Sequence, residues 1–256
     1  MAQESSVSTR WIKETASTNS YLKENGEIPD MCIVAAHTQT AGRGLRGNSW
    51  EAAPGKNLTF SFRFRPEGLL PSRQFIISQA VALAMVEGLK QFGIQASVKW
   101  PNDIYVGDMK IAGILIENQI MGSTIQSSLI GIGLNVNQTE FLSDAPNPVS
   151  MSQMSEREYN LEELLVVFGR LLETNLLRIP KETEHIQSEY KTALWRGDGL
   201  DYPFRDQASG LTYSAKIQSI EPSGHLILEL PDGSLRRYAF KEVEFLIPKA
   251  GNSTDK

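Results

Sequence analysis

Apolar and polar positions follow two different periods along most of the chain. Residues 57–64 alternate apolar and polar side chains, which predicts a strand. Apolar side chains recur every three or four positions over residues 72–92 and 160–178, which predicts two long helices. Pro180 breaks the second of these patterns, and a third helix is expected over residues 182–195.

Shorter elements lie between these segments. A short helix begins at Ser17 or Thr18. The run from 31 to 36 is apolar and predicts a strand, and residues 146–154 are expected to be a loop. An antiparallel meander is predicted between them, with strands at 98–100, 104–106, 110–117 and 127–137.

The composition of the chain changes at Gly197. Beyond it, short alternating strands are separated by tight turns, which predicts a small β-barrel. We therefore expect an α+β protein, with a mixed, largely antiparallel sheet flanked by helices and followed by the barrel. The expected domains are residues 1–196, residues 197–249, and a polar, disordered tail over residues 250–256.

Composition excludes several classes of protein. A hydrophobic fraction of 41% fills a core, and a net charge of −5 argues against broad attraction to nucleic acid. The single cysteine, Cys32, excludes an internal disulfide framework, and its apolar strand favours a core role over a nucleophilic one. The first residues lack a signal peptide, and the chain has no run of about 20 apolar residues. A cytoplasmic protein is expected.

The stretch from Gln39 to Trp50 carries the clearest chemistry. It places glycines at Gly42, Gly44 and Gly47, with two arginines between them. Free backbone N–H groups and guanidinium groups both bind anions. The same spacing occurs in dinucleotide-binding proteins, but there a helix follows the glycines, whereas here a strand is predicted. A plain surface turn is the remaining alternative.

Other polar residues allow two explanations each. Ser17, Thr18 and Asn19 either cap the short helix or bind a polar ligand group. Lys110 follows a turn, where lysines are usually solvated, but it also opens an apolar strand. Asn135 lies in an apolar run, so its amide needs a partner, either a ligand or another part of the protein.

Taken together, these motifs resemble the catalytic module of biotin–protein ligases over about 235 residues. The resemblance rests on the order of five motifs rather than on any single one. The motifs are 17–19, 42–50, 99–103, 110–117 and 131–135.

The resemblance implies an ATP-dependent, AMP-forming carbon–nitrogen ligase of the biotin–[acetyl-CoA-carboxylase] ligase type. Such an enzyme converts biotin and ATP to biotinyl-5′-AMP and pyrophosphate. It then transfers biotin to one lysine of a biotin carboxyl carrier domain and releases AMP. The resemblance also implies Mg²⁺ with ATP, although no metal ligands are identified in the sequence. The implied partner is the carrier domain of a biotin-dependent carboxylase.

The resemblance also assigns roles to residues. Those implied in catalysis are Lys110, Arg43 and Asp103, with Asp103 acting either as a general base or in orienting the carrier lysine. Those implied in biotin binding are Ser17, Thr18, Asn19, Gln39, Arg43, Gly44, Leu45, Trp100, Lys110 and Gly113, with Ile114 in the apolar wall. Those implied in binding ATP or the adenylate are Gly42, Arg43, Gly44, Arg46, Trp50 and Asn135.

Two positions depart from the pattern of this family, which reads Gly-Arg-Gly-Arg-x-x-Arg. Leu45 and Asn48 stand where the family has its second and third arginines. We expect either looser retention of the adenylate or compensation by Arg46.

Only 16 residues precede Ser17, too few for the DNA-binding domain of some relatives. The expectation is therefore a short form that is a monomer or homodimer, without a repressor role, DNA or membrane partner. The alternatives are a lipoate–protein ligase, which shares the fold, and a non-catalytic nucleotide-binding module.

Overall fold

A computed structural model describes residues 8–142 and 147–247 of the chain. It divides into two compact units, Met1–Trp195 and Arg196–Lys256. The expected tail at 250–256 lies outside the described residues. Within the described ranges, no helix is long and apolar enough to cross a membrane.

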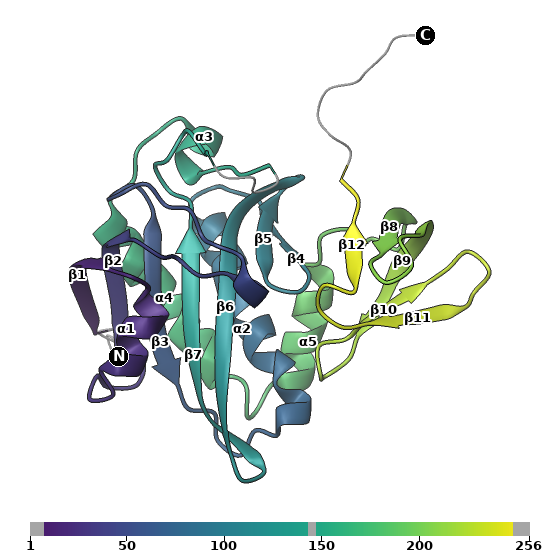
Figure 1. Ribbon diagram of the computed structural model, residues 1–256, viewed down its shortest axis with the longest axis horizontal. Helices are drawn as coiled ribbons and strands as arrows, with labels where there is room; N and C mark the ends of the chain where they lie inside the picture. The colour runs from purple at the N-terminus through teal and green to yellow at the C-terminus, as the bar shows by residue number, and fades with distance from the viewer. Residues whose placement is uncertain (1–7, 143–146, 248–256) are drawn as a thin grey trace. The chain divides into compact units, whose positions relative to one another are not determined.

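A seven-stranded mixed sheet forms the first unit, in the order β1-β2-β3-β7-β6-β5-β4 (Figure 1). β1 and β2 are parallel, and every other neighbouring pair is antiparallel, so the predicted mixed and largely antiparallel sheet is confirmed. The strands are β1 (Thr9–Thr15), β2 (Ile33–Gln39), β3 (Leu58–Phe64), β4 (Ser97–Lys99), β5 (Asp103–Val106), β6 (Met109–Met121) and β7 (Thr124–Leu134).

Helices cover both faces of this sheet (Figure 1). One face packs against α2 and α4, which supply the main core, whereas α1 covers part of the other. The α-helices are α1 (Thr18–Glu24), α2 (Phe75–Gln91), α3 (Met151–Ser155), α4 (Leu161–Leu177) and α5 (Thr183–Thr192), and short 3₁₀ turns occupy Leu45–Gly47 and Pro71–Arg73.

Strand β3 shows how the sequence creates these two layers. Two of its phenylalanines, Phe60 and Phe62, are fully buried. The alternate positions Ser61 and Arg63 face α1, and they are buried too. Arg63 donates hydrogen bonds to the carbonyls of Leu22 and Ile28, and so holds the end of α1 against the sheet.

The α1 face has its own small apolar cluster. It consists of Leu22, Ile28, Cys32 and Val34, with Ile12, Tyr21 and Leu129 packed around it. Cys32 is buried there, as predicted from its apolar surroundings. On the opposite face, a Cβ at Gly88 of α2 would overlap the Phe168 ring of α4, so glycine permits the close approach of these helices.

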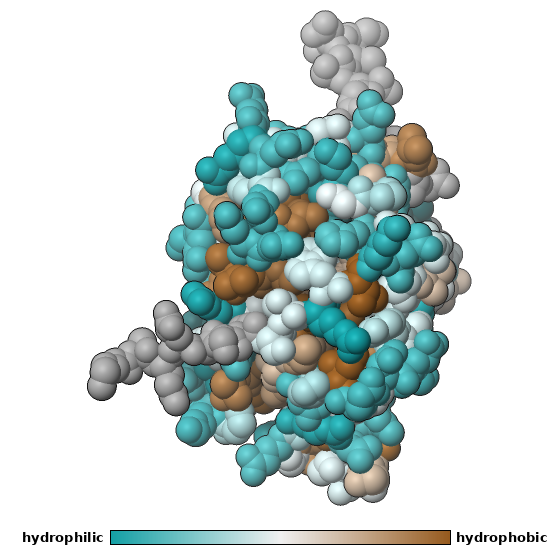
Figure 2. All heavy atoms as spheres, turned by 90° about the vertical axis from the view of Figure 1, so that its left-hand side faces the viewer, coloured by the Kyte–Doolittle hydropathy of each residue, from teal (hydrophilic) through white to brown (hydrophobic). Residues whose placement is uncertain are grey.

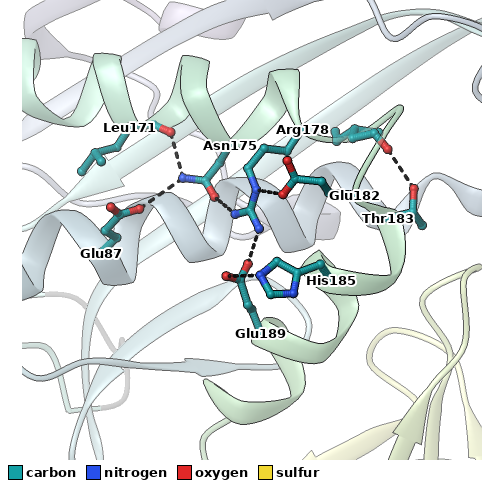
Figure 3. Close-up of polar contacts among 9 residues, drawn as sticks. Glu87, Leu171, Asn175, Arg178, Glu182, Thr183, His185 and Glu189 are labelled. Carbon is teal, nitrogen blue, oxygen red and sulfur yellow. Dashed lines mark hydrogen bonds and ion pairs between the residues drawn. The ribbon is translucent and has the colours of Figure 1, made fainter.

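A polar network ties α2, α4 and α5 together (Figure 3). Arg178 donates to Asn175, Glu182 and Glu189 at 2.9, 2.8 and 2.7 Å. The hydrogen bond to Glu182 is the main cause that raises the pKa of the Arg178 guanidinium. The Asn175 amide donates in turn to Glu87 of α2 at 3.3 Å, which fixes the packing of these helices below the sheet.

The second unit is a five-stranded antiparallel sheet in the order β11-β10-β9-β8-β12, in keeping with the predicted small barrel. Its strands are β8 (Tyr202–Asp206), β9 (Thr212–Ile220), β10 (Leu226–Glu229), β11 (Leu235–Tyr238) and β12 (Val243–Phe245). Phe204, Ala215, Leu226 and Leu228 are fully buried and form its core.

Several sequence expectations were incomplete. Residues 146–154 are not all loop, because α3 begins within them and Ser150 and Gln153 form a capping box. Strand β1 was not predicted, and neither were β8 and β12. Short strands with few alternating positions carry little periodic signal.

The exposed face at the left of Figure 1 is turned toward the viewer in Figure 2. Hydrophilic atoms cover most of it, and hydrophobic atoms emerge in separate patches. Scattered apolar side chains of this kind are normal on protein surfaces.

Candidate functional site

The glycine–arginine loop, residues 42–50, is closed by hydrogen bonds between its two limbs. The amide of Trp50 donates to the carbonyl of Gly42 at 2.9 Å, and the amide of Gly44 donates to Asn48 at 2.7 Å. A β-bridge between Arg43 and Ser49 completes the closure. Strand β3 follows the loop, and the long helix required for dinucleotide binding is absent from this described segment.

Glycines of β6 and β7 form a floor beneath Trp50. Gly113 and Gly133 are opposite each other across the two strands. A Cβ at Gly133 would overlap the indole ring, and one at Gly113 would lie 3.1 Å from it. The indole nitrogen is buried and has no hydrogen-bond partner among the described residues.

Lys110 lies over the same floor. Its ammonium nitrogen is 2.7 Å from Asp103 and 5.6 Å from the centre of the Trp50 ring. A Cβ at Gly113 would lie 3.4 Å from that nitrogen. The ion pair with Asp103 thus holds the lysine in the site.

A β-bulge gives Lys110 this orientation. Asp103 pairs with Gly113, but Tyr105 pairs with Lys110, so Ile111 is an extra residue in β6. Side chains three positions apart in a regular strand point to opposite faces. The bulge brings Lys110 and Gly113 to the same face, and bulges of this kind commonly re-aim a side chain beside a site.

A hydrogen-bonded polar chain borders the α1 end of the floor. The amide of Thr18 donates to Gln39 Oε1 at 2.8 Å, and the Thr18 hydroxyl lies 3.1 Å from the same oxygen. The Thr18 and Ser61 hydroxyls are 2.6 Å apart, and Ser61 donates to Asn19 Oδ1 at 2.6 Å. Ser17 is the N-cap of α1, but its side chain makes no capping bond. Capping alone therefore does not explain these polar residues.

The remaining predicted residues differ in their surroundings. The Asn135 amide donates to the carbonyl of Val149 at 3.1 Å, so a structural hydrogen bond exists there. Val149 donates in turn to the carbonyl of Lys110, which ties this segment to the lysine. Trp100 is only 2% exposed and belongs to the core of the unit. The side chain of Arg46 lies outside the part of the chain that the structure describes.

Two polar residues of the site were not predicted. Ser61 lies on β3, where the small polar side chains between phenylalanines were the available signal, but the alternation alone did not show that α1 buries them. Glu117 lies on β6, and its carboxylate accepts hydrogen bonds from Arg43 and Asn19. Within residues 8–142 and 147–247, no three His, Cys, Asp or Glu side chains are grouped as metal ligands.

The fold matches that of solved biotin protein ligases. A biotin protein ligase from Aquifex aeolicus, solved with biotin and ATP, superposes with a TM-score of 0.76 at 23% identity, covering 93% of this chain and 97% of that one. A biotin protein ligase from Leishmania major, solved with biotinyl-5-AMP, gives 0.62 at 20% identity over 91% and 98% of the two chains. The chain therefore has the fold of a protein ligase.

Sequence comparison identifies the family. Residues 11–135 match the model of the Biotin/lipoate A/B protein ligase family. The bifunctional ligase/repressor BirA of Bacillus subtilis strain 168 is 31% identical over an aligned length of 227 residues, and the alignment covers 84% of this chain and 66% of that protein. The biotin–[acetyl-CoA-carboxylase] ligase of Paracoccus denitrificans is 35% identical over 128 residues, 49% of this chain and 53% of that protein. The chain belongs to the biotin/lipoate protein ligase family.

Proposed function

We propose that this protein is a biotin–protein ligase. In the proposed reaction, ATP and biotin give biotinyl-5′-AMP and pyrophosphate, and biotin then passes to a lysine of a biotin carboxyl carrier domain with release of AMP. The observation that carries the proposal is the position of Lys110 over the glycine floor, beside Asp103 and Trp50. The names of the relatives support biotin as the substrate.

The first step brings two anions together, because a carboxylate attacks the α-phosphorus of ATP. A cation between them lowers this barrier by positioning the reactants and by stabilising the developing charge. We assign this role to Lys110, which exchanges its contact with Asp103 for the carboxylate and the α-phosphate. Mg²⁺ bound to ATP supplies further charge neutralisation.

The polar chain at α1 suits the ureido group of biotin. That group presents a carbonyl acceptor and two N–H donors, and hydroxyl and amide groups can satisfy both kinds of atom. We assign this contact to Thr18, Asn19, Gln39 and Ser61, with Ser17, Arg43 and Gly44 beside them. We assign the apolar rings and chain of biotin to the wall around Gly113 and Ile114, beside the Trp50 ring.

The second step needs the amine of the carrier lysine to attack the carbonyl carbon of the anhydride. A C–N bond forms, the C–O bond to AMP breaks, and the amine loses a proton. Asp103 is the carboxylate nearest to Lys110 in the described structure. It acts either as the base for that proton or by orienting the incoming amine, and the two roles stay open.

The substrate is tested by isothermal titration with biotin and with lipoate, each with and without a non-hydrolysable ATP analogue. Biotin binding that strengthens with the nucleotide supports the proposal. Binding of lipoate instead keeps the adenylation chemistry and changes the substrate. If neither acid binds, the proposed function is wrong.

Removal of Lys110 tests the mechanism. We expect Lys110→Ala to lower biotin-dependent pyrophosphate release by roughly 10²- to 10³-fold, the effect typical of losing one preorganised electrostatic contact. Lys216→Ala is the control, because Lys216 also forms an ion pair, 3.0 Å from Glu229 in the second unit. Equal rates for the two variants would exclude the assigned role of Lys110.

A further inference from the structure

Glu117 connects two parts of the candidate site that are far apart in the sequence. One carboxylate oxygen, Oε1, accepts from Arg43 of the glycine–arginine loop at 2.9 Å. The other, Oε2, accepts from Arg43 at 3.3 Å and from Asn19 of α1 at 2.8 Å. The Glu117 and Arg43 side chains are 35% and 47% exposed, so the loop contact is open to water, whereas Asn19 is buried.

This carboxylate fixes the orientation of the Asn19 amide. Asn19 turns its NH₂ group toward Glu117 and its carbonyl oxygen toward the Ser61 hydroxyl. Ser61 thereby uses its only proton, so its oxygen accepts from Thr18, 2.6 Å away. The direction of the whole polar chain therefore depends on an acceptor at position 117.

The same carboxylate holds the glycine–arginine loop. The loop is a closed unit, because Gly42 and Gly44 are hydrogen-bonded to Trp50 and Asn48 on its return limb. A contact made by Arg43 consequently restrains the loop as a whole, including the Trp50 ring on the glycine floor. A bidentate arginine–carboxylate contact sets the orientation of both groups.

We propose that Glu117 is a positioning residue that links the order of the glycine–arginine loop to the orientation of Asn19. This inference rests on the proposed function where it concerns biotin, because Asn19 then contacts the ureido group. Biotin that fixes Asn19 favours the contact between Glu117 and Arg43, and a closed loop favours biotin by the same factor. Glu117 touches neither reacting atom, so it is not a catalytic residue.

Glu117→Gln tests the link, because it keeps the size of the side chain and removes the charge. Glutamine keeps one acceptor oxygen for Asn19 but places an NH₂ donor where Oε1 accepts from Arg43, so the bidentate contact with the arginine is lost. The matched control is Glu244→Gln in the second unit, where Glu244 also accepts from an arginine, Arg205, and an amide, Gln207. Glu117→Asp is a second variant, which keeps the charge but shortens the reach.

The first measurement is limited chymotrypsin digestion of the full-length, ligand-free protein, with mass spectrometry of cuts after Leu45 and Trp50. We expect loop cleavage in Glu117→Gln to be roughly two- to fivefold faster than in the parent, the range set by a solvent-exposed ion pair. Glu117→Asp should give an intermediate rate. Unchanged loop cleavage in Glu117→Gln would overturn the proposal, and so would an equal acceleration in Glu244→Gln. If Glu117→Gln does not fold, Glu117→Asp decides: a folded Glu117→Asp protein cleaved at the parental rate would overturn the proposal.

The second measurement is biotin titration of the same proteins. We expect Glu117→Gln to bind biotin several-fold more weakly, and biotin to protect its loop from cleavage less than it protects the parent. Equal protection of both proteins would overturn the link. If the parent binds no biotin, the proposed function fails, but the digestion of the ligand-free proteins still decides whether Glu117 holds the loop.

Discussion

Leu45 opens the 3₁₀ turn at the tip of the glycine–arginine loop, where the family pattern has an arginine. An arginine there can hold the phosphate of the adenylate by a charge-assisted hydrogen bond, whereas leucine cannot. We expect Leu45→Arg to slow release of biotinyl-AMP from the protein by roughly 10- to 100-fold, since such a bond contributes roughly 1.5–3 kcal/mol. The measurement is the rate at which adenylate appears in solution. Unchanged leakage would contradict the prediction and favour compensation by Arg46.

Burial of the Tyr190 hydroxyl in α5 lowers the stability of the folded protein. Its ring packs edge-on against Phe75, but its hydroxyl has no hydrogen-bond partner among the described residues. Burial raises the pKa of this hydroxyl above its ordinary value. The folded state therefore resists ionisation of Tyr190. The contribution of this effect to the free energy of unfolding is fully present below about pH 10, the pKa of a tyrosine in the unfolded chain, and it is lost as the pH rises above that value.

We expect Tyr190→Phe to be as stable as the parent or up to about 2 kcal/mol more stable at pH 7, because an unsatisfied buried group is removed. Its stability should also fall less between pH 9 and 11 than that of the parent, pH values that bracket the tyrosine pKa of about 10. Urea unfolding at each pH measures both effects. Tyr21→Phe, at a partly exposed tyrosine, is the control, and identical alkaline profiles for Tyr190→Phe and the parent would refute the account.

At the scale of elements, the periodicity of apolar residues predicted the two long helices and the strand with regular alternation. The helices at 72–92 and 160–178 and the strand at 57–64 all exist within a few residues of the expected bounds. Periodicity did not reveal that both faces of β3 are covered, because alternation shows a difference between faces and not what packs on each. For the same reason it identified Thr18 and Asn19 but not their partners Ser61 and Glu117, which lie 42 to 98 positions away.

The glycine floor gives a prediction about β6 and β7. We expect Gly133→Ala to displace the Trp50 ring and to weaken ligand binding by roughly tenfold or more, since overpacking typically costs about 1–3 kcal/mol. Gly26→Ala is the control, because a Cβ there meets nothing within 4 Å. Trp50 fluorescence and biotin titration measure the two effects. Normal binding by a folded Gly133→Ala protein would show that the floor tolerates a methyl group.

At the scale of the whole molecule, the two compact units have separate cores. The structure divides the chain after Trp195, and the domain boundary expected from the change of composition at Gly197 stays a prediction. The order of motifs along the chain predicted the family, which one short motif cannot do. The position of Lys110 over the glycine floor required coordinates, because it depends on one extra residue in a strand.

The separate cores predict separate effects. Phe204 is fully buried in the second unit, against Phe245 at 4.9 Å between ring centres. We expect Phe204→Ala to destabilise that unit by about 3–5 kcal/mol while biotin binding in the first unit is retained. Calorimetry should show a low-temperature transition that biotin does not shift. Complete loss of biotin binding together with loss of the second unit would show that the units fold as one.

The bulge at Ile111 determines what the deletion of one residue from β6 would do. In a regular strand, odd and even positions face opposite sides of the sheet. Lys110 and Gly113 lie on the same side only because the extra residue Ile111 interrupts this alternation once. Deleting Ile111 would leave every polar side chain of the site in the sequence and restore a regular strand. Lys110 and Gly113 would then stand two positions apart on the same face, so we expect the ammonium group to stay over the glycine floor without the bulge.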